Sequence, residues 1–156
     1  LHVVTSVAFP GAIAGFLTLA IVGATSQDGA VARASYVAMA LLTWDVIVPL
    51  AVASLVIGVV QSLGTPWGLV RYYWIIVKLV LTIIAVAALL LQTQTINAIA
   101  AASLQDELSG MNGSRLAMIL HGAGGLLVVI VAAVLPIYKP RGLTPYGARR
   151  LADRAT

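Results

Sequence analysis

Three ionisable side chains lie inside long apolar stretches of this sequence: Asp45, Lys78 and His121. A charge in an apolar helix is costly and usually marks a functional site. By the rise of an α-helix, Asp45 and His121 lie about 12 Å and about 10 Å from the same end of their segments, so they can meet. Such a pair would carry protons, bind a cation or orient a metal ligand, unless it is only a structural hydrogen bond.

Two further candidates lie toward the opposite end. The stem of Lys78 is long enough to reach lipid headgroups; otherwise this lysine neutralises a buried anion such as a haem propionate or a lipid phosphate. His2 is roughly 20 Å from His121 by helical rise, too far for both to ligate one haem in a monomer. His2 is therefore read as an interfacial histidine, and His121, alone or across a dimer, stays a candidate axial haem ligand.

Composition identifies the solvent around these groups. The 156 residues are 61% hydrophobic and 9% charged, whereas soluble domains are roughly 45–50% apolar and about 25% charged. A soluble fold of this size cannot bury so much apolar surface. Apolar segments recur as far as residue 138, so an N-terminal signal peptide does not explain them. The chain has no cysteine, which excludes disulfides, thiolate metal sites and cysteine nucleophiles.

Four stretches are long enough to span a bilayer, which takes about 20 apolar residues. We expect an all-α, integral membrane four-helix transmembrane bundle with spans at about 1–22, 34–63, 72–91 and 115–138, followed by a basic tail at 139–156. The second stretch is longer than a bilayer requires, and Pro49 is its expected kink. The connection after residue 91 is expected to extend the third helix or to form a short surface helix, before a break at Gly110–Gly113.

Basic residues indicate the orientation. An even number of spans places both termini on one side, together with Arg71 and the basic tail residues Lys139, Arg141, Arg149, Arg150 and Arg154. Arg33 and Arg115 lie on the other side, so the positive-inside rule predicts cytoplasmic termini. An aromatic belt is expected at the inner interface, made of Trp67, Tyr72, Tyr73, Trp74 and Tyr138. The tail offers only Tyr146 for stacking, which argues against a nucleic-acid partner.

Small residues occur where helices are expected to touch. Lipid tails solvate leucine as well as another helix does, so membrane helices associate through close packing of small residues. The candidate packing positions are Gly11, Gly15, Ser54, Gly58, Gly122, Gly124 and Gly125. Close approach of a flat cofactor to the region from Gly122 to Gly125 is the alternative.

Three stretches carry a family resemblance: LHVVTSVAFPGAIAGFLTLA, VQSLGTPWGLVRYYWIIVKLVLT and HGAGGLLVVIVAAVLPIYKPRGLTPYG. They resemble an uncharacterised family of predicted actinobacterial integral membrane proteins, most specifically in GTPWGL…YYW..VK at 64–78 and YKPRGLTPYG at 138–147. The resemblance implies four helices in a bacterial plasma membrane and no established activity. The family pattern has an apolar or aromatic residue in place of Asp45, so it does not imply the pair of Asp45 and His121.

A looser likeness concerns haem. The histidine at the start of the first span and W..VK in the third are similar to membrane proteins of the copper-resistance D type and of the haem-biosynthetic membrane oxidase type. That likeness would place His2 and Lys78 near a haem.

The sequence contains no motif of a soluble enzyme. There is no Walker motif, no Gly-x-Ser-x-Gly and no His-Glu-x-x-His, and Glu107 is the only glutamate. We therefore expect a non-enzymatic accessory or structural subunit that acts through helix–helix contacts, as a homo-oligomer or with a membrane protein partner. Two alternatives stay open: a haem- or quinone-associated redox protein built on His121, or on His2 and Lys78, and a small proton-coupled transporter or channel built on Asp45.

Overall fold

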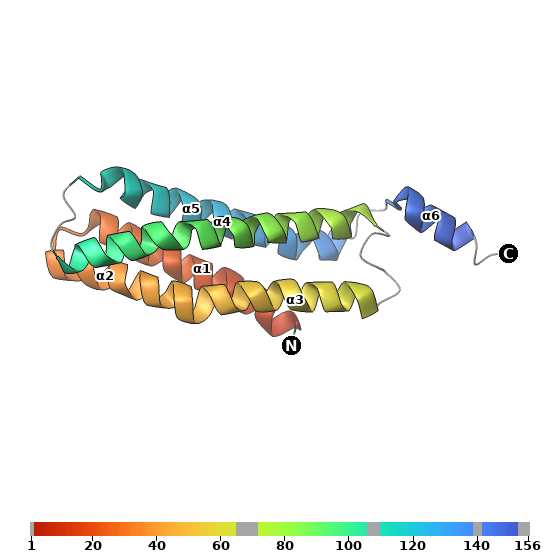
Figure 1. The fold of residues 1–156 in the computed structure, drawn as a ribbon, viewed down its shortest axis with the longest axis horizontal. Coiled ribbons are helices and arrows are strands. Elements are labelled where there is room, and N and C mark those ends of the chain that lie inside the picture. Colours follow the sequence, from red (N-terminus) through yellow and green to blue (C-terminus); the bar gives the residue numbers. More distant parts are fainter. Residues whose placement is uncertain (1, 65–71, 106–109, 139–141, 153–156) are drawn as a thin grey trace.

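The computed structural model describes residues 2–64, 72–105, 110–138 and 142–152. In these residues four long helices pack side by side, and the predicted all-α four-helix bundle is confirmed (Figure 1). The elements are α1 (His2–Thr25), α2 (Gly29–Leu42), the π-helical turn η1 (Thr43–Ile47), α3 (Val48–Gly64), α4 (Tyr73–Leu104), α5 (Asn112–Tyr138) and α6 (Pro145–Ala152).

Four helical segments are long and apolar enough to cross a membrane. They are Ala8–Thr25, Gly29–Gly64, Tyr73–Leu104 and Asn112–Leu135. The second consists of α2, η1 and α3 in one continuous helix of 36 residues. The chain therefore has the structure of a multi-pass membrane protein.

The irregularity expected at Pro49 is a π turn just before it. The backbone N–H of Val48 donates to the carbonyl oxygen of Thr43, five residues back. Proline has no N–H to donate, and its ring crowds the carbonyl four residues earlier, here that of Asp45. A wider turn is one way for a helix to accommodate that conflict.

The helix ends differ from those expected. α4 continues to Leu104, so the first alternative for the connection after residue 91, an extension of the third helix, is confirmed. Gly110 has φ of 91°, a conformation that favours glycine, and α5 starts two residues later. The sequence does not predict α6, a short helix in the tail that lies beyond one end of the bundle (Figure 1). Near that end, the backbone N–H of Tyr73 donates to the carbonyl oxygen of Gly142 at 3.2 Å.

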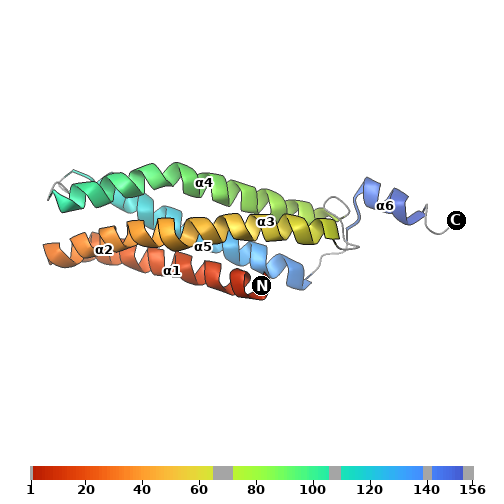
Figure 2. The same ribbon diagram turned by 60° about the horizontal axis from the view of Figure 1, so that its bottom comes forward.

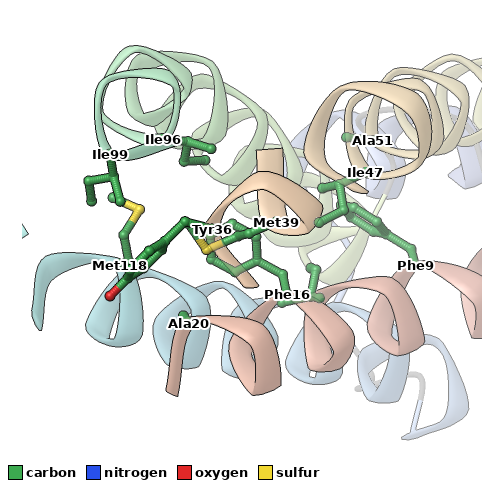
Figure 3. Packing of buried hydrophobic residues seen from close by; sticks show 11 residues of the cluster. Phe9, Phe16, Ala20, Tyr36, Met39, Ile47, Ala51, Ile96, Ile99 and Met118 are labelled. Atoms are coloured by element: carbon green, nitrogen blue, oxygen red, sulfur yellow. The ribbon is translucent and has the colours of Figure 1, made fainter. Parts of the chain in front are cut away.

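The two ends of the bundle differ in packing. Figures 1 and 2 show the α1–α2 and α4–α5 connections together at one end, here called the α2 end, with α6 beyond the other, the α6 end. The largest fully buried apolar side chains include Tyr36, Met39, Ile96, Ile99 and Met118, which all lie in the part nearer the α2 end (Figure 3). Toward the α6 end about half of the large apolar side chains are exposed, as on α3 at Val52, Val56 and Val60, although exposed ones such as Leu41 and Leu116 occur toward the α2 end as well.

Candidate functional site

Asp45 lies in the π turn η1, and its side chain is exposed. Its neighbour Trp44 is 47% exposed. The Trp44 ring Nε1 donates to Oδ1 of the exposed Asn97 on α4 at 3.0 Å. Asp45 is thus on the outer surface of the bundle, level with Asn97.

His121 lies on α5 with its side chain half-buried. It borders a cavity of about 40 Å³ whose other walls are largely apolar, among them Phe9, Phe16 and Leu89. The helix that carries Asp45 contributes Ile47 to this cavity and not Asp45. The structure therefore does not bring Asp45 and His121 to a common cavity.

Lys78 lies on α4 and is also half-buried. It borders a second cavity, of about 70 Å³, together with Ser54 and Thr82. The Thr82 hydroxyl donates to the Lys78 carbonyl at 2.8 Å, so it is engaged by its own helix. The two cavities share Phe9, Ala85 and Val129, and they therefore adjoin. Each has room for only a few water molecules.

Neither of the cavities described beside His121 and Lys78 is large enough for a haem. Sites for ligands of that size enclose about 300–1,000 Å³, far more than the cavities of about 40 and 70 Å³ beside His121 and Lys78. Among the described residues, no group of three or more histidine, cysteine or acidic residues is placed to hold a metal ion. His2 begins α1, and its side chain lies outside the described residues.

The candidate packing glycines fall into two groups. A Cβ added at Gly122 would lie 3.2 Å from Phe16 and 3.3 Å from Leu17, so this glycine lets α5 approach α1 closely. A Cβ added at Gly15 would lie 3.5 Å from the Leu42 side chain. In contrast, a Cβ would meet nothing within 4 Å at four positions: Gly11, Gly58, Gly124 and Gly125.

The exposed face of α1 carries only small residues until it reaches the exposed Ile21 and Val22. Between residues 8 and 20 its exposed positions are Ala8, Gly11, Ala14 and Thr18, here called the small face of α1. The exposed positions of α3, α4 and α5 toward the α6 end include large aliphatic residues such as Val56, Ile84 and Leu127. Small exposed faces are typical of helix–helix contacts in membranes, because they let two backbones approach closely.

A polar cluster at the α2 end was not expected from the sequence. Arg115 Nε donates to Tyr36 Oη at 2.7 Å, and its Nη2 donates to the carbonyl oxygens of Gly23 at 2.8 Å and Ala24 at 3.5 Å. The guanidinium carbon lies 5.8 Å from the centroid of the Tyr36 ring. The position of Arg115 at the start of an apolar run predicts only a charge that flanks a spanning helix. The sequence offers one hint of the cluster: the last carbonyl groups of the first helix need hydrogen-bond donors.

These positions therefore describe a bundle with two small, partly open cavities between its helices, an exposed aspartate and the small face of α1. No family model, no curated protein and no solved structure matches this chain.

Proposed function

We propose that this chain is a non-enzymatic integral membrane subunit, accessory or structural, that acts through helix–helix contacts. The observation that carries this proposal is the small face of α1, where Ala8, Gly11, Ala14 and Thr18 are exposed. In lipid no hydrophobic force holds helices together, so close packing of small residues does so. A face without large side chains gains little from lipid contact and much from a second helix.

The proposed occupant of the small face is α1 of a second copy. A two-fold contact places the same face on both sides, so it is self-complementary and requires no other component. The proposal places both termini in the cytoplasm of a bacterial cell, with the exposed Arg149 of α6 on that side. Asp45 and His121 border no common cavity, and the proposal assigns them no proton pathway.

Cysteine cross-linking tests this contact, because the chain has no cysteine of its own. Ala14→Cys places a thiol on the small face, and Ala87→Cys places one on an exposed position of α4. In vesicles of phosphatidylcholine and phosphatidylglycerol, mild oxidation is expected to give a disulfide-linked dimer from Ala14→Cys and little from Ala87→Cys. As a second measurement, Ala14→Leu is expected to weaken association by energy transfer between labelled copies, and Ala87→Leu to leave it unchanged. Equal cross-linking at both sites and no effect of Ala14→Leu would overturn the proposal.

A further inference from the structure

We infer that the bilayer covers only the part of the bundle toward the α6 end, and that the part toward the α2 end stands in water as a helical cap. The lipid headgroups meet the bundle at the level of Trp44, Asp45 and Asn97. The cap consists of α2, the end of α1, the α4 residues after Asn97 and the beginning of α5.

Helix length requires some part of the bundle to leave the hydrocarbon core. The helix from Gly29 to Gly64 has 36 residues and α4 has 32, so they measure about 54 Å and about 48 Å at the α-helical rise. The hydrocarbon core is about 30 Å thick. Even at a tilt of about 40°, the upper end of the observed range, both helices are longer than this thickness.

Aromatic side chains mark the lower boundary. Tyr73 begins α4 and Tyr138 ends α5, and both are exposed at the α6 end. Tyrosine and tryptophan are enriched at membrane interfaces. About 20 residues cross the hydrocarbon, so counting from Trp74 leads to Gln94 and counting back from Tyr138 leads to Met118.

The helix from Gly29 to Gly64 gives the same upper boundary. Counting back about 20 residues from Gly64 leads to Trp44. Trp44 Nε1 is 3.0 Å from Asn97 Oδ1, and Gln92 Nε2 is 4.0 Å from Met118 Sδ. The two contacts meet α4 at Asn97 and Gln92, five residues or about 7.5 Å apart along the helix. The three counts, each along a different helix, therefore end within about the thickness of one headgroup layer.

The exposed residues at this level suit the headgroup region. Asp45, Gln94 and Asn97 are all exposed there. A lipid-facing carboxylate in hydrocarbon is costly, whereas at the interface it stays hydrated. The ring of Trp44 is exposed and its N–H donates a hydrogen bond. Tryptophan at a membrane interface typically combines an apolar ring face with a satisfied polar N–H in this way. Asp45 therefore needs no buried partner.

The composition of α4 changes at the same level. In α4, residues 74–91 contain only Lys78 and Thr82 as polar side chains, whereas the next thirteen residues contain Gln92, Thr93, Gln94, Thr95, Asn97 and Ser103. Hydrocarbon solvates the first stretch well, whereas the exposed polar side chains of the second stretch need water or headgroups around them.

Thiol accessibility tests the boundary on one face of one helix. Ala87 and Ala98 are both exposed on α4, and eleven residues make about three turns, so they lie on the same face. In vesicles of phosphatidylcholine and phosphatidylglycerol, a charged maleimide present on both sides is expected to label Ala98→Cys like a free thiol. Ala87→Cys is expected to react roughly 100-fold more slowly, because a charge enters hydrocarbon at high cost.

A second pair repeats the test on the neighbouring helix. Val31→Cys on α2 and Val56→Cys on α3 replace exposed valines, and only Val31→Cys is expected to label. All four thiols should react equally once the vesicles are dissolved in SDS. Protection of Ala98→Cys and Val31→Cys to the same degree as their partners would mean that hydrocarbon reaches the α2 end, and would overturn the inference.

Discussion

Arg115 joins three helices through its single guanidinium group. It donates to the Tyr36 hydroxyl on α2 and to the Gly23 carbonyl in the last turn of α1. Hydrogen bonds from a charged donor are the stronger kind, and a cation suits the negative end of a helix. A Cβ at Gly23 would lie 2.9 Å from the Tyr36 ring, so glycine is what allows the ring to lie against α1.

The variant Arg115→Ala is therefore expected to be unstable. It leaves the hydroxyl of the fully buried Tyr36 without its donor, and we expect the free energy of unfolding to fall by about 2–3 kcal/mol. The measurement is unfolding in detergent micelles, followed by circular dichroism. Arg149→Ala, which removes an exposed arginine of α6, is the matched control and should change stability by less than about 0.5 kcal/mol. Equal stability of the two variants would show that the cluster does not hold the helices together.

Among the long helices of the bundle, α3 has the fewest buried residues in the part of the chain that the structure describes. Ala51 is its only buried side chain among the described residues, and it packs in the core cluster with Phe9 and Ile47 (Figure 3). Most of the remaining α3 surface is apolar and at least partly exposed. The helix is therefore positioned by η1, by its contact with α4 and by one small side chain.

Enlarging that side chain should displace α3. Ala51→Leu inserts three carbon atoms at a position that is 1% exposed, and overpacking of this kind costs about 1–3 kcal/mol. Val52→Leu, one residue further and 47% exposed, is the control and should be nearly neutral. Thermal unfolding of both variants in the same micelles provides the comparison. A neutral Ala51→Leu would indicate that α3 is free to move away from the bundle.

The sequence predicted the number and order of the spanning helices, because apolar runs and their Gly and Pro breaks are local features. It left open whether α4 runs on past residue 91 or is followed by a separate surface helix. Polar residues there fit a helix, since the Thr93 and Ser103 hydroxyls donate to carbonyls three residues back, while Ile96 and Ile99 are buried by other helices. The short helix α6 has no apolar run to reveal it.

The candidate site was harder to predict for a geometric reason. Helical rise gives the depth of Asp45 but not the direction of its side chain. Asp45 lies two residues after the buried Thr43 and two before the buried Ile47, so it faces away from the core. The bonds of Arg115 reach residues 79 to 92 positions away in sequence, so no local pattern contains them.

At the scale of the whole molecule, the position of the bilayer determines how thick a membrane the protein prefers. The inferred hydrocarbon layer runs from Trp74 to Gln94 on α4 and from Tyr138 to Met118 on α5, about 20 residues each, which matches a hydrocarbon core of about 30 Å. The helix of 36 residues would instead match a much thicker bilayer if all of it were immersed. The two possibilities predict opposite responses to lipid chain length.

We expect stability to be highest in bilayers of ordinary thickness. In phosphatidylcholine vesicles with monounsaturated chains, the unfolding temperature measured by circular dichroism should peak at C18 and fall at C22, because a thicker core would immerse the exposed side chains of Asp45, Gln94 and Asn97. Asp45→Leu should lose less stability at C22 than the unaltered protein, since it removes the most costly of these groups, whereas Val52→Leu should not alter the dependence on chain length. A maximum at C22 would instead mean that hydrocarbon surrounds the bundle as far as the α2 end, and that Asp45 faces it.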